Sequence, residues 1–287
     1  MPGLPCRRGE DTAGFLRAHT VSVRCRGGFL ERGTPFYEEN CLSDGLFSLA
    51  DLPAMQTRAL RESCTLHAKS GALVEEGAQV DVSVRLGRGA IVRRGARITG
   101  RSFVGEDVVI SGDSIIEDSV IGAGTQIVSS RLLSAKVGKN CQVGPYATLR
   151  PASVIGDGVR IGSFVECKNA QIGDGAKIAH LAYVGDAELG ARVNVGCGVV
   201  FVNFDGRRKA KSIVGEGAFL GSNCNLVAPV RVGAGCFIAA GTTLTRDLAD
   251  GDFCIGRCRG NIGRNGRGKY LTLDRRDGGD TRVQVPA

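Results

Sequence analysis

Aliphatic residues recur at every sixth position from Val74 to Leu244, and most are followed by glycine and, four places on, by a small or β-branched residue. The adjoining runs Ile155-Gly-Asp-Gly-Val159 and Ile161-Gly-Ser-Phe-Val165 show the pattern. A period of six fits neither the helical nor the simple strand period. It predicts a solenoid of short strands, in which the first and fifth side chains of each hexad point inward while glycine or aspartate occupies the bends.

Among the interruptions of this period, three segments stand out. The hexads over 167–171 and 184–188 have only five residues, and the segment Asn203-Phe-Asp-Gly-Arg-Arg-Lys-Ala-Lys-Ser212 breaks the pattern altogether. This polar, basic segment must loop out of the solenoid. Loops held by a rigid scaffold are a usual place for functional residues.

The repeat divides the chain into three parts. Residues 1–73 lack hexads, and we expect them to form a capping or packing segment with a helix from Asp51 to about Leu66, because aspartate is a good helix cap and proline is tolerated in the first turn. Residues 74–245 form the predicted solenoid, and residues 246–287 form a basic tail.

The hexads resemble those of the hexapeptide-repeat acyltransferases. The resemblance implies an all-β fold, a left-handed parallel β-helix with three hexads per triangular coil. It also implies a homotrimer, with the ligand sites between neighbouring prisms, because the flat faces of a single prism are otherwise left uncovered.

Composition agrees with many tight turns, since the chain has 43 Gly, no Trp and 5% aromatic residues. The net charge is +8, and the segment from Phe253 onward, with eight Arg and Lys against three Asp, carries +5 of it. Its stretch from Gly260 to Gly268 has no aromatic residues interleaved with the cations, so a nucleic-acid partner is not expected.

Eleven cysteines, an odd number, include no C-x-x-C pair, and the N-terminus has no apolar leader. No window is apolar enough to span a membrane. We therefore expect reduced thiols, a cytoplasmic protein and no membrane partner. Cys64 and His67 form a lone C-x-x-H without the paired spacing of a structural zinc site, so no metal is expected.

The register of the hexads assigns a direction to each side chain. Four cysteines are predicted to point inward as small hydrophobic residues, which makes them poor nucleophiles: Cys141, Cys167, Cys224 and Cys236. Cys197 is predicted to point outward, but no activating charge is evident beside it, so its reactivity stays open.

His180 is the only histidine in the repeat region and takes an outward position. It is either a solvated surface residue or, because Leu181 and Tyr183 also point outward, part of a subunit seam. One histidine cannot supply the three-histidine zinc site of the carbonic anhydrases that share this fold, so that activity is excluded.

Arg150 and Lys168 each follow the first residue of a hexad and are one coil apart, so their side chains should stack. Two cations at that spacing repel each other. Either the long side chains splay apart, or they share an anion such as a phosphate, with Lys209 and Lys211 of the basic segment as further donors.

Several longer motifs resemble one enzyme family more closely. They are Gly144-Pro-Tyr-Ala-Thr-Leu-Arg-Pro151, Gly162-Ser-Phe-Val-Glu-Cys-Lys168, Ala179-His-Leu-Ala-Tyr-Val-Gly-Asp186, Asn194-Val-Gly-Cys-Gly198, Asn203-Phe-Asp-Gly206 and Gly221-Ser-Asn-Cys-Asn-Leu-Val-Ala-Pro-Val230. Over roughly residues 74–260 the chain resembles the acetyltransferase domain of the bacterial bifunctional enzymes that make UDP-N-acetylglucosamine. The resemblance implies acetyl transfer from acetyl-CoA to the 2-amine of glucosamine 1-phosphate, an amino-sugar phosphate, with no metal needed.

The same resemblance implies a role for each matching position. His180 would be the general base, with Glu166 orienting it and Asn194 in the same catalytic set. Arg150, Lys168, Tyr183 and Lys209 would bind the sugar phosphate, and Asn203, Phe204, Ser222, Ala240 and Arg257 would contact acetyl-CoA. Imidazole titrates near the pH at which an ammonium must be deprotonated, which suits the role of His180.

The chain departs from this family in two ways. Phe204 stands where the family usually has tyrosine, which removes one hydroxyl from the site. The first 73 residues contain neither the glycine-rich UTP loop nor room for a nucleotidyltransferase domain, so uridylyl transfer is not expected.

Two other functions remain open at this point. One is acylation of another amino sugar or of a sugar nucleotide on the same scaffold. The other is a non-catalytic subunit that binds a sugar nucleotide or a partner protein. The joint presence of His180, Arg150, Lys168, Asn194 and Asn203 favours an enzyme.

Overall fold

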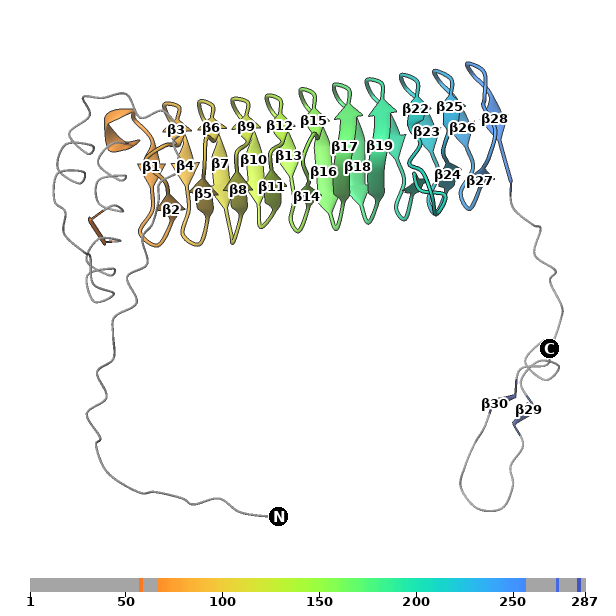
Figure 1. Cartoon of the computed structure of the whole chain (residues 1–287), viewed down its shortest axis with the longest axis horizontal. Coiled ribbons are helices and arrows are strands. Elements are labelled where there is room, and N and C mark those ends of the chain that lie inside the picture. Colours follow the sequence, from red (N-terminus) through yellow and green to blue (C-terminus); the bar gives the residue numbers. More distant parts are fainter. Residues whose placement is uncertain (1–56, 59–66, 257–271, 274–282, 285–287) are drawn as a thin grey trace, which may run out of the picture. The chain divides into compact units, whose positions relative to one another are not determined.

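The computed structural model of the chain describes residues 57–58, 67–256, 272–273 and 283–284 (Figure 1). Contacts divide the chain into two units, residues 1–58 and 59–287. Most of the helix predicted from Asp51 to about Leu66 lies outside the described residues, although Thr57 and Arg58 are helical, as are residues 67–69. In the tail, β29 (Thr272–Leu273) and β30 (Val283–Gln284) pair antiparallel.

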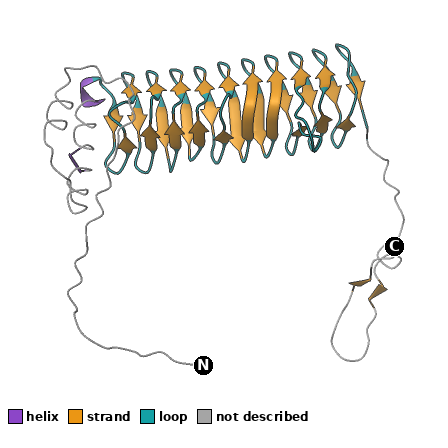
Figure 2. Cartoon of the chain, viewed as in Figure 1, coloured by secondary structure: helices purple, strands orange, loops and turns teal. Residues whose placement is uncertain are grey.

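Residues 73–254 form a solenoid whose short strands stack in parallel on three faces (Figures 1 and 2). Face 1 contains β1 (Leu73–Val74), β4 (Ile91–Val92), β7 (Val109–Ser111), β10 (Gln126–Val128), β13 (Gln142–Val143), β16 (Arg160–Ser163), β18 (Lys177–His180), β20 (Asn194–Val195), β23 (Phe219–Leu220), β26 (Phe237–Ile238) and β28 (Phe253–Cys254).

Faces 2 and 3 carry the remaining strands of the solenoid. Face 2 contains β2 (Gln79–Val80), β5 (Arg97–Thr99), β8 (Ile115–Glu117), β11 (Arg131–Leu133), β14 (Thr148–Leu149), β21 (Val200–Val202), β24 (Asn225–Val227) and β27 (Thr243–Leu244). Face 3 contains β3 (Arg85–Leu86), β6 (Phe103–Val104), β9 (Val120–Ile121), β12 (Lys136–Val137), β15 (Val154–Ile155), β22 (Ser212–Val214) and β25 (Val230–Val232).

Two long strands, β17 (Glu166–Ile172) and β19 (Tyr183–Leu189), belong to both of these faces. Strand β17 begins in register with β14 on face 2 and ends in register with β15 on face 3. These strands contain the five-residue hexads 167–171 and 184–188. The chain bends at Asn169 (φ 47°) and Asp186 (φ 48°) without leaving the strand. At β17 and β19, faces 2 and 3 join into one 17-stranded sheet.

The interior of the solenoid is one continuous apolar core. The first and fifth positions of the hexads are buried as predicted, and Ile161 and Val165, for example, are each 1% exposed. The four cysteines predicted to point inward are buried, whereas Cys197 is exposed. With the parallel strand register, this burial confirms the predicted fold, a left-handed parallel β-helix.

Close stacking of the coils explains why glycine follows so many inward residues. A Cβ atom added to Gly122 would lie 2.5 Å from the carbonyl carbon of Gly138 in the next coil. One added to Gly105 would lie 2.7 Å from the backbone nitrogen of Ala123. Parallel strands are about 4.8 Å apart, and at this position that spacing leaves no room for a side chain.

The last strand of face 1, β28, pairs with β26 and so extends the solenoid past residue 245, the end of the regular hexads. Among the residues that the structure describes, no helix is long and apolar enough to cross a bilayer.

The core predicts a clear contrast between two adjacent residues of β9. Ile121 is fully buried, whereas Val120 is 41% exposed. Ile121→Ala is expected to lower the free energy of unfolding by about 2–5 kcal/mol, because it leaves a cavity, and Val120→Ala by less than about 1 kcal/mol. Urea titrations followed by circular dichroism measure both values. Equal losses for the two variants would contradict the inward register.

Candidate active site

Face 2 gathers most of the residues that the sequence singled out. The pairing of Leu149 with Cys167 places the next residues, Arg150 and Lys168, in register one coil apart, as predicted. The backbone N–H of Arg150 donates to the carbonyl oxygen of Cys167 at 2.8 Å. Glu166 and Tyr183 are likewise partners in the ladder of β17 and β19. Arg150 and Lys168 thus form one column across the coils, and Glu166 and Tyr183 form the column next to it.

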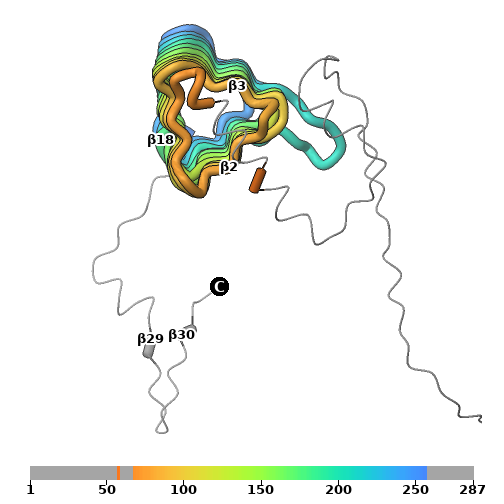
Figure 3. Tube along the Cα trace, turned by 90° about the vertical axis from the view of Figure 1, so that its left-hand side faces the viewer, coloured from red at the N-terminus to blue at the C-terminus, as the bar shows by residue number. Residues whose placement is uncertain are grey.

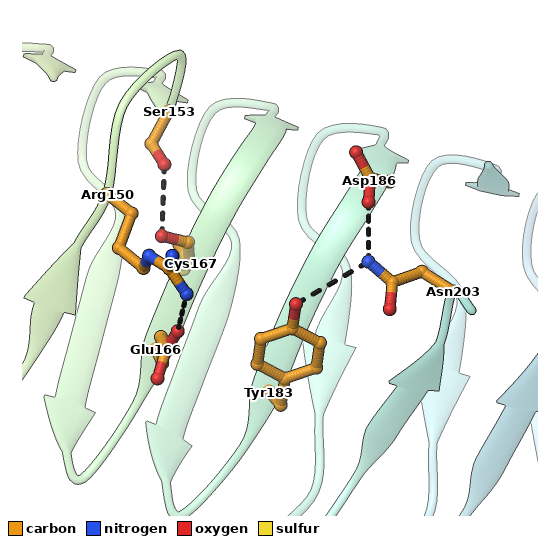
Figure 4. A network of polar contacts seen from close by, with 7 residues as sticks. All are labelled: Arg150, Ser153, Glu166, Cys167, Tyr183, Asp186 and Asn203. Carbon is orange, nitrogen blue, oxygen red and sulfur yellow. Dashed lines mark hydrogen bonds and ion pairs between the residues drawn. The ribbon is translucent and has the colours of Figure 1, made fainter. Parts of the chain in front are cut away.

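Arg150 and Glu166 form an ion pair across adjacent coils. Arg150 Nη1 lies 2.9 Å from Glu166 Oε1, and the two side chains are 43% and 40% exposed (Figure 4). The hydrogen bond from Arg150 to Glu166 raises the pKa of the guanidinium. The sequence interpretation had Glu166 orienting His180, whereas in the structure the partner of this carboxylate is Arg150.

Lys168 lies in a cluster of positive charge. The ammonium group of Lys209 lies beside it and, together with Arg150, lowers the pKa of Lys168. Asp186 acts in the opposite direction and offsets part of this repulsion. The fold therefore brings together three cations from distant parts of the sequence, and such a cluster is suited to bind an anion.

Lys209 reaches this cluster because the segment after β21 leaves the solenoid, as Figure 3 shows for the projecting loop. Phe204 and Lys209 pair as an antiparallel bridge across this loop. The carboxylate of Asp205 accepts hydrogen bonds from the backbone N–H groups of Arg207 and Arg208, which lower its pKa and fix the turn. Phe204 at the base of the loop is 54% exposed.

The second basic residue predicted from the loop, Lys211, has a different partner. Lys211 Nζ lies 2.6 Å from Glu188 Oε1 in β19. Lys209 is therefore the loop lysine whose charge acts on Lys168, while Lys211 pairs with a carboxylate near the other end of β19.

Tyr183 leans over Gly185, two residues further along β19. A Cβ atom added to Gly185 would lie 2.4 Å from the Tyr183 hydroxyl oxygen and 2.6 Å from its Cζ atom. Gly185 also occupies the rung next to Lys168. A side chain here would displace the tyrosine ring, so this glycine makes space for the position of Tyr183.

A polar network that the sequence interpretation missed surrounds Asp186. Its Oδ1 accepts a hydrogen bond from Asn169 Nδ2 at 2.6 Å, and its Oδ2 accepts one from Asn203 Nδ2 (Figure 4). Asn203 Nδ2 also lies 3.5 Å from the hydroxyl oxygen of Tyr183. The available signal was the shortened hexad, since Asn169 and Asp186 occupy equivalent positions in the two five-residue repeats.

His180 and two of the residues expected to contact acetyl-CoA occupy another edge of the prism, where face 1 ends. His180 is exposed at the end of β18 and pairs with Ser163 of the preceding coil. The strand register continues this column through Cys197, Ser222 and Ala240, all of which are exposed. His180 and the two predicted donor contacts thus form one line, with successive members one coil apart.

Four further predicted residues do not join this line. Asn203 and Phe204 directly follow β21 of face 2. Asn194 lies at the start of β20, between Lys177 and Phe219 of the neighbouring coils. Arg257 lies outside the described residues. Within the described part of the chain, no group of three or more His, Cys, Asp or Glu side chains is placed to hold a metal ion.

A ridge of exposed apolar residues runs beside His180. Tyr146, Phe164 and Leu181 occupy the bend after face 1 and are 61%, 62% and 57% exposed. All three have left-handed backbone angles, with φ of 59°, 58° and 41°. The rings of Tyr146 and Phe164 stack with centroids 5.5 Å apart. Large residues in this conformation are strained, and such strain gathers at functional sites.

Comparison with known proteins identifies the repeats. The family model described as "Bacterial transferase hexapeptide (six repeats)" matches residues 134–169 and 211–246. These two stretches of the solenoid therefore carry hexapeptide repeats of that type.

The hexapeptide-repeat chain is 40% identical over 225 residues to the "Bifunctional protein GlmU" of Listeria monocytogenes serotype 4a, covering 78% of this chain and 49% of that protein. It is 47% identical over 180 residues to the protein of the same name from Clostridioides difficile, covering 63% of this chain and 39% of that protein. It therefore spans about half the length or less of these curated relatives.

Solved structures named as an acyltransferase and an acetyltransferase domain are less similar in sequence. The "UDP-N-acetylglucosamine acyltransferase from Campylobacter jejuni" is 25% identical with a TM-score of 0.25, covering 65% of this chain and 70% of that one. The "Acetyltransferase domain of PglB" from Neisseria gonorrhoeae is 22% identical with a TM-score of 0.29, covering 57% and 77% of the two chains.

The contact between Tyr183 and Gly185 predicts a coupled pair of substitutions. Gly185→Ala is expected to destabilise the protein by about 1–3 kcal/mol, because the new methyl group overlaps the tyrosine ring. In a Tyr183→Ala background the same change should cost much less, since the ring is gone. Unfolding free energies of the four proteins measure this coupling. Additive losses would show that Gly185 is needed for another reason.

Proposed function

We propose that this protein transfers an acetyl group from acetyl-CoA to the 2-amine of glucosamine 1-phosphate, giving N-acetylglucosamine 1-phosphate. The observation that carries the proposal is the cluster formed by Arg150 and Lys168 of face 2 with Lys209 of the projecting loop. Like charges held together are relieved when a phosphate binds between them, which favours a phosphorylated acceptor over a neutral sugar.

The curated relatives support the same reaction class. They are named bifunctional GlmU proteins, and the matched region includes the motifs that carry Arg150, Lys168, His180 and Asn203. The chain spans only part of each relative, so the proposal concerns acetyl transfer by the repeat region alone. Acylation of a different amino sugar is the alternative that an acceptor panel tests.

The column that begins at His180 supports a binding place for the acetyl donor. An extended pantetheine arm fits along Cys197, Ser222 and Ala240, which are one coil apart and have small side chains. The thioester would then lie near the imidazole. In this role His180 removes a proton from the sugar ammonium, and the free amine attacks the thioester carbonyl carbon. The carbon–sulfur bond breaks, and CoA leaves as a thiol after taking up a proton.

The reaction needs no covalent enzyme intermediate. Four cysteines of the solenoid are buried, and burial raises the pKa of Cys167 to about 12, which keeps that thiol unreactive. The developing oxyanion requires a hydrogen-bond donor, and a backbone N–H on the glycine-rich bend beside the His180 column could supply it.

The apolar ridge supports a trimer. A chain exposing Tyr146, Phe164 and Leu181 side by side leaves a strained, water-facing apolar strip next to His180. We assign this ridge, of which only Leu181 was proposed as a seam residue from the sequence, to the contact with a neighbouring copy. A neighbouring prism placed there would cover His180 and complete a closed site that excludes water.

Substitutions of the phosphate-binding cations and of the general base should change the kinetics in different ways. Arg150→Ala or Lys168→Ala is expected to lower kcat/KM for glucosamine 1-phosphate about 10–100-fold more than for glucosamine, because only the phosphate loses a charge-assisted bond. His180→Ala should lower kcat on both acceptors by about 10²–10⁴-fold. A thiol-release assay with acetyl-CoA measures these values.

Two controls accompany this assay. Lys136→Ala removes a surface cation on face 3 and should leave both acceptors unchanged. Cys197→Ala tests direct transfer: at saturating acetyl-CoA its kcat should stay close to that of the unmodified protein, because no thiol takes part in the chemistry. Equal losses on the two acceptors for Arg150→Ala and Lys168→Ala would refute the phosphate cluster, and a His180→Ala protein with normal turnover would refute the general base.

Sedimentation equilibrium at micromolar concentration tests the trimer. The unmodified protein is expected to sediment as a trimer, and Phe164→Ser or Leu181→Ser should dissociate it, because a polar side chain removes apolar contact area at the ridge. Val154→Ser is the matched control, since Val154 is 43% exposed on face 3, away from the ridge. A fully active monomer would contradict the proposed assembly.

A further inference from the structure

Asp186 is the carboxylate at the centre of the network beside the cations. It accepts hydrogen bonds from the amides of Asn169 and Asn203. Burial alone would raise the pKa of Asp186, but these two donors and the charges of Lys209 and Lys168 together lower it. Asp186 is therefore ionised at neutral pH.

The ionised carboxylate fixes which way the Asn203 amide faces. A carboxylate without a proton can only accept hydrogen bonds, so Asn203 must turn its NH₂ group toward Asp186. The opposite orientation would place the amide oxygen against a negative charge. Consequently the Oδ1 atom of Asn203 faces away from Asp186 (Figure 4).

The orientation of Asn203 also sets the polarity of Tyr183. The NH₂ group of Asn203 lies 3.5 Å from the Tyr183 hydroxyl oxygen, which is therefore on the accepting side of this contact. The phenolic hydrogen is left to donate elsewhere. The site then offers hydrogen-bond donors from Tyr183 and the cations, and the Oδ1 atom of Asn203 as an amide acceptor.

We propose that Asp186 is a positioning residue that, through Asn203, selects a ligand carrying a hydrogen-bond donor next to its phosphate. An amine or hydroxyl of a sugar phosphate meets this requirement, whereas a bare phosphate uses only the cations. This inference rests on the proposed function and deepens it, because it assigns Asn203 as an acceptor toward the amino sugar. It thereby excludes Asn203 as a donor to the acyl oxygen.

Asp186→Asn gives a sharp test, because it should reverse the polarity. The new amide keeps its oxygen toward the Asn169 donor and turns its own NH₂ group toward Asn203. Asn203 must then rotate to accept, and its NH₂ group faces the ligand. Binding of glucosamine 1-phosphate should weaken about tenfold or more. Inorganic phosphate should bind as well as before or more tightly, because one negative charge beside Lys168 and Lys209 is gone.

The double variant Asp186→Asn/Asn203→Asp exchanges the two side chains. It restores one amide donor and one carboxylate acceptor, now at the opposite positions. The amide at 186 then donates to a carboxylate at 203, which again offers an acceptor to the ligand and keeps the total charge. This double variant should regain most of the lost affinity for glucosamine 1-phosphate. A residue with a merely structural role would not produce this rescue.

Asp118→Asn is the matched control. Asp118 lies at the bend between faces 2 and 3, as Asp186 does, with nearly the same backbone angle (φ 47° against 48°). It is several coils away from the cations, and its carboxylate accepts a backbone N–H from Arg101. Its substitution should leave the affinities for both ligands unchanged.

Isothermal titration calorimetry of the full chain, with glucosamine 1-phosphate and with inorganic phosphate, measures the ratio of the two affinities for each variant. The inference predicts that this ratio falls about tenfold in Asp186→Asn and recovers in the exchange variant. A parallel loss for both ligands, an unchanged ratio, or an exchange variant no better than Asp186→Asn would overturn it.

The same experiment separates this inference from the proposed function. Binding does not require turnover, so a protein that shows the predicted ratios without acetyl transfer would contradict the proposed function alone. An active enzyme whose ratio does not respond to Asp186→Asn would contradict the inference alone. If the unmodified protein binds glucosamine 1-phosphate and inorganic phosphate equally well, the inference about Asp186 is also overturned, because there is then no selection for the sugar.

Discussion

The parallel stacking of coils is the constraint on which the rest of the structure depends. Because strands lie about 4.8 Å apart and backbones nearly touch at positions such as Gly122, every residue is placed directly above its equivalent in the preceding coil. Side chains on a face therefore form columns that run along the solenoid, with one residue from each coil. The cations at Arg150 and Lys168, and the line from His180 to Ala240, follow from this geometry.

The site arises where the repeat is irregular. At the five-residue hexads 167–171 and 184–188, faces 2 and 3 merge, and the bend between them carries the polar residues Asn169 and Asp186. The segment after β21 leaves the coil and places Lys209 beside Lys168. The regular hexads build the scaffold, and these departures from them bring the polar groups of the site together.

Charge balance keeps these groups in place without a ligand. Glu166 pairs with Arg150, and Asp186 offsets the repulsion between Lys168 and Lys209. The cations are thus held in position before an anion arrives, which lowers the reorganisation needed on binding. The same two carboxylates limit the net positive charge, so that affinity depends on the rest of the ligand as well as on its phosphate.

The sequence by itself determined the solenoid, the inward cysteines, the stacking of Arg150 with Lys168 and the outward direction of His180, because a fixed period assigns each residue to a face. It could not supply the partner of Glu166 or the network around Asp186. Those contacts join side chains from different coils and from a loop without a period, so their pairing depends on rotamers and distances. Only the tertiary structure decided them, because hydrogen bonds of this kind depend on geometry that no repeat encodes.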